Sequence, residues 1–155
     1  MRIGILAVGR LRDAPEAGLT ADYLTRASAA GRSLGLGPVD LTEIDERRAR
    51  SRDAQAQRLI EAAPGGVLVA LDERGKAMTS PALADFLARQ RDGGTRVLAF
   101  AIGGADGHGS ALLARADHTL SLGPMVWPHA LVRVMMAEQI YRAVSILAGA
   151  PYHRV

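Results

Sequence analysis

Strand-like and helix-like segments alternate along the whole chain, and this alternation constrains the fold more strongly than any other feature of the sequence. Short apolar or alternating runs, typical of strands, occupy 2–9, 39–44, 65–72, 96–104 and 118–122. Apolar residues recur at helical spacing over 15–31, 51–63, 80–94, 110–116 and 128–148. Buried strands that alternate with helices predict a parallel sheet covered on both faces, which is a three-layer α/β/α fold.

Two helix starts carry capping signals. Ser51 is the expected N-cap of the helix over 51–63. Ser80 is the expected cap of the helix over 80–94, because Pro81 follows it at a position that tolerates proline.

The bulk composition is that of one globular domain over 1–155, with 48% hydrophobic and 23% charged residues. No stretch is long and apolar enough to span a bilayer. The first ten residues have a strand pattern, with Gly9 and Arg10 where a leader peptide would extend its apolar run. We therefore expect a cytoplasmic protein that makes no contact with a membrane.

Residue usage excludes several kinds of chemistry. The chain has no cysteine, which rules out disulfides, thiolate zinc sites and a cysteine nucleophile. Its four histidines include no metal-binding pair at helical spacing and no HExxH motif, so we expect no metal. The net charge of +3 permits an anionic partner, but six aromatic residues are too few for a platform that stacks nucleic-acid bases.

Three polar or glycine-rich segments follow predicted strands: LDERGK at 71–76, IGGADGHG at 102–109 and LGPMVWPH at 122–129. In parallel sheets, ligands bind at the carboxyl ends of the strands. The glycines of the second segment do not match the dinucleotide fingerprint, and no phosphate-binding loop is present. Taken singly, LDERGK and IGGADGHG are also compatible with ordinary turns.

The helix over 128–148 is apolar on nearly every side, so the sheet and a second subunit must both cover it, and we expect a homodimer. Arg133, Glu138 and Arg142 are its charged residues, and Glu138 and Arg142 are spaced to pair. Two interpretations stay open for them: a structural network at the interface, or a catalytic role. The tail GAPYHRV that follows holds Tyr152, His153 and Arg154.

Together LDERGK, IGGADG, SLGPM, PHALVRVMMAEQIYRA and PYHR resemble the ribosomal RNA large subunit methyltransferase H family, in the SPOUT superfamily, over the whole chain. The resemblance implies a homodimer with a deep trefoil knot near the C-terminus that binds S-adenosylmethionine in the knot. It also implies methylation of N3 of pseudouridine 1915 in the helix 69 loop of 23S rRNA, within the 70S ribosome or the 50S subunit.

Carried over by position, the resemblance implies a cofactor pocket in which backbone groups hold the adenine edge and apolar side chains cover its faces. The expected residues are Leu71, Gly103, Leu122, Gly123, Pro124, Met125, Val126 and Trp127. Val126 and Trp127 depart from the family pattern, which has threonine and leucine at these two positions. The loss of the hydroxyl removes one hydrogen bond, worth about 1 kcal/mol.

We expect His153 or His129 to aid removal of the N3 proton, because histidine titrates near neutral pH. Tyr152 and Arg154 would orient that base and a nearby phosphate, and Arg133, Glu138 and Arg142 would position the group from the last helix. The tail would then lie over the cofactor loop as a lid. Two rival functions are a ribosome-binding homologue without activity and a nucleotide-binding reductase that uses IGGADGHG.

Overall fold

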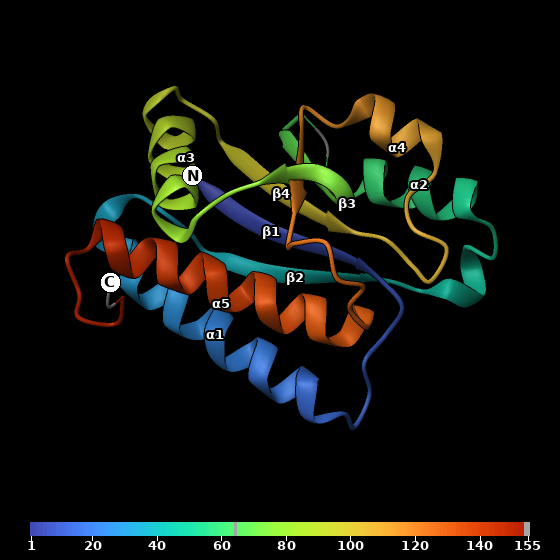
Figure 1. Ribbon diagram of the computed structural model, residues 1–155, viewed down its shortest axis with the longest axis horizontal. Helices are drawn as coiled ribbons and strands as arrows, with labels where there is room; N and C mark the ends of the chain where they lie inside the picture. The colour runs from blue at the N-terminus through green and yellow to red at the C-terminus, as the bar shows by residue number, and fades with distance from the viewer. Residues whose placement is uncertain (64, 154–155) are drawn as a thin grey trace.

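The computed structural model describes residues 1–63 and 65–153, and its described strands form one parallel sheet in the order β2-β1-β4-β3-β5 (Figure 1). The strands are β1 Arg2–Val8, β2 Val39–Ile44, β3 Val67–Ala77, β4 Val97–Ile102 and β5 His118–Ser121. Every pairing in the sheet is parallel, so all carboxyl ends lie at the same edge. The predicted alternation of strands and helices is confirmed.

Helices cover both faces of the sheet (Figure 1). One face carries α1 Pro15–Gly31, α3 Ser80–Asp92 and α5 His129–Leu147, and the other carries α2 Arg52–Glu61 and α4 Ser110–Arg115. Side chains of β1 alternate between the two layers: Ile3 and Ile5 pack with the first group, and Leu6 and Val8 with the second. Two short 3₁₀ helices, η1 Arg32–Leu34 and η2 Glu46–Arg48, flank β2.

The helix caps are partly as predicted. Ser51 caps α2, and its Oγ accepts a hydrogen bond from the Ala54 N–H at 3.1 Å. The prediction for α3 is wrong by one residue, because Thr79 is the cap and its Oγ1 accepts from the Ala82 N–H at 3.2 Å. Ser80 is the first helical residue instead, and its hydroxyl donates to Oε1 of Gln139 at 2.7 Å.

The segment LDERGK is not the loop that its charges suggested. β3 runs on through it to Ala77, and its pairing with β5 shifts register between Leu71 and Lys76. Gly75 fits this irregular stretch because a Cβ at its position would lie 2.8 Å from the backbone of Leu120. The irregularity leaves Asp72, Glu73 and Arg74 beside the carboxyl edge of the sheet.

The structure bears on two further expectations. No helix among the described residues is long and apolar enough to cross a membrane. The trefoil knot depends on which segment threads through which loop, and strand order does not test it, so the knot stays a prediction.

Candidate active site

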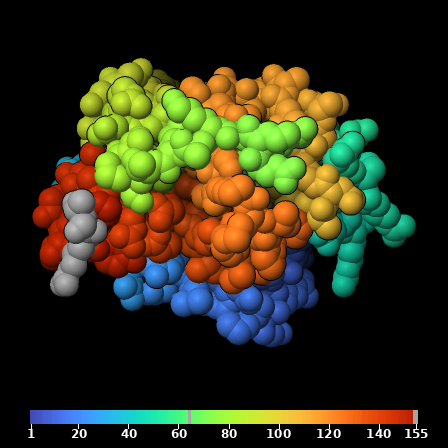
Figure 2. All heavy atoms as spheres, in the orientation of Figure 1, coloured from blue at the N-terminus to red at the C-terminus, as the bar shows by residue number. Residues whose placement is uncertain are grey.

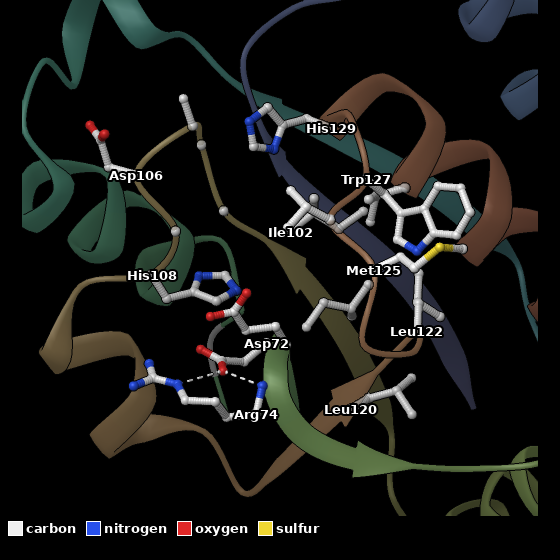
Figure 3. Close-up of a pocket in the computed structure, with 18 of the residues that line it drawn as sticks. Asp72, Arg74, Ile102, Asp106, His108, Leu120, Leu122, Met125, Trp127 and His129 are labelled. Carbon is white, nitrogen blue, oxygen red and sulfur yellow. Dashed lines mark hydrogen bonds and ion pairs between the residues drawn. The ribbon is translucent and has the colours of Figure 1, made fainter.

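The irregular part of β3 and the segments after β4 and β5 surround one cavity of about 420 Å³ at the carboxyl edge of the sheet (Figure 3). Its walls include seven of the eight residues predicted to bind the cofactor: Leu71, Gly103, Leu122, Gly123, Met125, Val126 and Trp127. Pro124 is exposed and does not line the cavity. The three segments therefore form one site, although binding by these residues stays a prediction.

The glycine-rich segment after β4 forms a tight turn against the cavity. The Gly107 N–H donates to the Gly104 carbonyl at 2.9 Å, and Gly107 has a φ of 72°. A Cβ on Gly103 would lie 2.9 Å from the carbonyl carbon of Gly107, so a larger residue would force the turn open. At the glycines, backbone atoms without side chains therefore form part of the cavity wall.

The loop between β5 and α5 is held at its start and open at its middle. The Ser121 hydroxyl lies 3.2 Å from the carbonyl oxygens of Glu73 and Gly123 and accepts from the Gly123 N–H at 3.2 Å. Farther on, Met125 is 63% exposed and Val126 is 86% exposed. The middle of this loop is therefore an exposed apolar surface at the wall of the cavity.

The opposite wall is polar. Asp72 accepts hydrogen bonds from the Arg74 N–H at 2.9 Å and from Arg74 Nε at 3.3 Å, and the backbone bond in particular lowers the pKa of Asp72. Beside it lies His108, only 8% exposed, with no hydrogen-bond partner for either ring nitrogen among the described residues (Figure 3). Burial lowers the pKa of His108, partly opposed by nearby backbone and Asp72, so its ring is neutral at pH 7.

Sequence reasoning did not select His108 as a site residue. The available signal was a histidine inside a glycine-rich turn at a strand end, which is also typical of an ordinary loop.

A second polar group joins the tail to α5. The Tyr152 hydroxyl donates to Glu138 Oε1 at 3.0 Å, and Arg142 donates to the same oxygen from Nη2 at 2.7 Å and from Nε at 3.0 Å. The predicted pairing of Glu138 with Arg142 is confirmed. Nη1 of Arg142 lies 3.5 Å from Nδ1 of His153, and the guanidinium lies 4.9 Å from the centroid of the Tyr152 ring.

This group continues through Gln139 into α3, where it includes Ser80, a residue that sequence reasoning did not assign to it. Gln139 Nε2 donates to Glu138 Oε2 at 2.8 Å, and Ser80 donates to Gln139 at 2.7 Å. Burial raises the pKa of Tyr152, so the phenol stays protonated and acts as a donor. We call Ser80, Gln139, Glu138, Arg142, Tyr152 and His153 the tail network.

The structure separates the predicted catalytic residues into three places. His129 begins α5 and lines the cavity, whereas Arg142 lies thirteen residues along the same helix, about 20 Å away at 1.5 Å per residue. The chain's own tail, which is bonded at Glu138 and Arg142, therefore does not lie over the cofactor loop as the expected lid. Arg154 falls outside the described residues.

Arg133 belongs to neither place. Its side chain is 2% exposed, and its guanidinium donates to the carbonyls of Val8 at 2.6 Å and Gly9 at 2.9 Å and to Glu43 at 2.8 Å. Within its own chain Arg133 does not contact the tail that it was expected to position; it holds the carboxyl end of β1 against α5. Helical spacing alone does not predict that Arg133 contacts the end of β1 while Glu138 contacts the tail.

These features define an α/β domain with a cavity at the carboxyl edge of a parallel sheet. The family model described as "Predicted SPOUT methyltransferase" matches residues 1–153. The ribosomal RNA large subunit methyltransferase H of Ruegeria pomeroyi is 56% identical over 156 residues, covering 100% of both chains. That of Roseobacter denitrificans is 58% identical over 155 residues, covering 99% of both.

Among solved structures, a probable methylase family protein from Haemophilus influenzae Rd KW20 has a TM-score of 0.53 and 12% identity. The match covers 95% of this chain and 66% of that one, and it supports the fold alone. The relatives extend along the full length of the chain at more than half identity. The chain belongs to the ribosomal RNA large subunit methyltransferase H family of SPOUT methyltransferases.

Proposed function

We propose that this enzyme transfers a methyl group from S-adenosylmethionine to N3 of pseudouridine 1915 in the helix 69 loop of 23S rRNA. Its substrate is the rRNA within the assembled 70S ribosome or 50S subunit, and the reaction takes place in the cytoplasm. One observation carries the proposal: three segments shared with the family converge on a single cavity in a chain that matches its relatives from end to end.

The residues of the cavity fit an adenosyl group. A volume of about 420 Å³ is typical of small-molecule sites, which are mostly apolar with a few polar groups. Leu71, Ile102 and Trp127 supply apolar surface, and the glycines supply backbone donors and acceptors. When bound, S-adenosylmethionine supplies an electrophilic methyl group on a sulfonium, whose departure as a neutral thioether requires no metal.

The task of the protein is then to position the base and to accept its N3 proton. In-line placement of the nucleophile contributes several kcal/mol. Tyr152 is excluded as the proton acceptor, because its raised pKa keeps it protonated. His153 and His129 stay the two candidates, His153 from the tail network and His129 from the cavity wall.

The distance along α5 supports the homodimer, in which a second copy of the chain completes the site. Because its own tail is held about 20 Å from His129, the cavity of one chain receives its catalytic tail from another. The surface for such a dimer is present: Met125, Val126 and Leu131 are exposed large apolar residues near the start of α5. A second cavity of about 590 Å³, lined by Met78, Val134, Met135 and others, continues this apolar surface along the helix.

The proposal is tested by incubating the purified protein with labelled S-adenosylmethionine and ribosomes that lack the modification, followed by mapping of the label. We expect label at pseudouridine N3 in 70S ribosomes or 50S subunits. Label in protein-free rRNA but not in ribosomes would refute the substrate. Calorimetry separates the rivals, because a reductase would bind NAD(P)H instead and an inactive ribosome-binding homologue would bind neither.

A further inference from the structure

Exposed arginines gather at the edge of the sheet that carries the cavity. Arg10 and Arg12 follow β1, while Arg47, Arg48, Arg50 and Arg52 follow β2, and all six are exposed. In Figure 2 the second of these segments is the teal group whose side chains project at the right of the molecule. We call these six residues the arginine edge.

The two segments form one surface that reaches the cavity. The Leu11 N–H donates to Glu43 Oε1 at 3.0 Å, and Arg10 lies 3.7 Å from Asp45, so the segments after β1 and β2 lie side by side. Arg52 itself lines the cavity. The arginine edge is therefore continuous with the rim of the candidate active site.

Most guanidinium groups of the arginine edge form no ion pair with a carboxylate of the described residues. Most other described arginines form ion pairs, as Arg26 does with Asp22 at 2.8 Å and Arg115 with Asp117 at 3.1 Å. On the arginine edge only Arg10 has such a contact, at 3.7 Å, while five guanidinium groups have no ion pair among the described residues. The members without a pair are Arg12, Arg47, Arg48, Arg50 and Arg52.

Nearby carboxylates do not cancel this charge, although Asp13, Asp45, Glu46 and Asp53 lie in the same segments. Asp45 is engaged in capping η2, where it accepts from the Arg47 N–H at 3.0 Å. The carboxylate of Glu46 lies beside Gly9 and near Arg133; burial lowers the pKa of Arg133, and the charges of Glu43 and Glu46 partly oppose that shift. Six cations against four anions leave the arginine edge positive.

We propose that the arginine edge is the surface on which backbone phosphates of the rRNA substrate dock while the target base enters the cavity. This inference rests on the proposed function. Guanidinium groups bind phosphate oxygens in a bidentate manner and suit an RNA backbone. The edge holds no aromatic residue for base stacking, so its contacts are to phosphates and add affinity without sequence specificity.

The test compares two triple variants of equal charge change. The first carries Arg47→Gln, Arg48→Gln and Arg50→Gln. The control carries Arg32→Gln, Arg89→Gln and Arg96→Gln, three exposed arginines near the amino ends of β2 and β4, with no ion pair among the described residues. Both are assayed for co-sedimentation with 50S subunits and 70S ribosomes, for methylation, and for S-adenosylmethionine binding by calorimetry.

We expect the first variant to bind ribosomes at least about tenfold more weakly, with a salt dependence shallower by about two to three units of log–log slope. Its S-adenosylmethionine affinity and thermal stability should match the wild type, and the control should bind ribosomes as the wild type does. Equally weakened ribosome binding in both variants would show an effect of net charge only and would overturn the inference. Ribosome binding of wild-type strength by the first variant would overturn it as well. Because co-sedimentation does not depend on turnover, a wild-type protein that binds ribosomes but methylates nothing would refute the proposed function alone.

Discussion

The hydroxyl of Tyr152 donates a hydrogen bond to Glu138 Oε1 at 3.0 Å, across 14 residues of sequence. The same oxygen accepts two bonds from Arg142, so the carboxylate joins the tail to the last helix. Chain ends usually fray unless they are tied down. Here an ionised acceptor ties down a residue of the tail, and the bond holds His153 beside the Arg142 guanidinium.

Replacement of Tyr152 by phenylalanine tests this bond. Hydrogen bonds to charged groups contribute about 1.5–3 kcal/mol, so we expect methyl transfer to fall about 10- to 100-fold in kcat if the bond holds the tail for catalysis. S-adenosylmethionine binding and thermal stability should change little. Gln139→Leu, which removes the donor to the other Glu138 oxygen, should lower kcat in the same direction, while KM for ribosomes stays near the wild-type value. Wild-type kcat in both variants would contradict a catalytic role for the tail network.

The sequence predicts the elements well because each strand and helix carries its own signal. The apolar run predicted as a strand over 96–104 indicates burial on both faces directly, and β4 occupies Val97–Ile102 within it. The cap of α3 is misplaced because Thr79 and Ser80 are chemically equivalent, and only the extended backbone at Thr79, with ψ of 159°, decides between them. The sequence does not predict the full length of β3, because the charged residues at its irregular part lack the apolar pattern of a buried strand.

The sequence predicts most residues of the cavity but not how the other candidate residues are arranged around it. Seven of the eight expected cavity residues meet because parallel strands end at one edge, which the topology dictates. His129 and His153 do not meet within one chain, because proximity in a list of polar residues ignores the rise of the helix between them. The contacts of Arg133 could not be predicted for a related reason, since its partners Val8 and Gly9 lie more than 120 residues earlier in the chain.

We expect Arg133 to contribute to the free energy of unfolding. Its removal leaves two buried carbonyls without a donor and Glu43 without its ion pair. Breaking a buried pair costs about 3–5 kcal/mol, and we expect Arg133→Met to fall near the lower value because Glu43 is partly exposed. A loss of about 3 kcal/mol corresponds to about 6–12 °C in Tm for a domain of this size. Arg26→Met, which removes an exposed pair, is the control and should shift Tm by less than about 2 °C. Equal shifts in thermal scans would contradict the anchoring role.

Trp127 offers a direct signal for cofactor binding. It is the single tryptophan of the chain, it lines the cavity, and its indole N–H is buried with no acceptor among the described residues. A ligand beside it should change the polarity around the ring, so we expect a saturable change in tryptophan emission on titration with S-adenosylmethionine. Trp127→Leu, which restores the residue of the family pattern, removes the signal, and calorimetry should still detect binding within about tenfold of the wild type because backbone groups are retained. An unchanged emission spectrum at saturation would place the adenosyl group elsewhere.

His108 makes stability depend on pH. Burial lowers its pKa below the ordinary value of 6.5, so the unfolded chain binds more protons than the folded one as the pH falls below 6.5. This contribution to stability is present above pH 6.5 and is lost on acidification. We therefore expect Tm of the wild type to fall more steeply between pH 7 and pH 5 than Tm of His108→Leu. Parallel curves in thermal scans at pH 7, 6 and 5 would show that His108 titrates normally in the folded protein.

The arrangement of tail and cavity gives the sharpest prediction for the dimer. Deletion of 152–155 should leave a folded dimer that binds S-adenosylmethionine and transfers little or no methyl, because the side-chain hydrogen bonds that the described part of this segment makes are those of the tail network. Gly103→Ala should have the complementary defect, since its Cβ would strike the Gly107 backbone at 2.9 Å and distort the cavity while leaving the tail intact.

Mixing these two inactive proteins distinguishes a tail that acts within its own chain from one that acts on a second copy. A heterodimer pairs the intact cavity of the truncated chain with the intact tail of the Gly103→Ala chain. Random exchange makes half of the dimers mixed, each with one working site of two, so we expect about a quarter of wild-type methyl transfer. The measurement is ribosome methylation after unfolding and refolding the mixture, with each variant refolded alone as the control. If the tail acted on its own cavity, every site in the mixture would lack one part and activity would stay at the level of the controls.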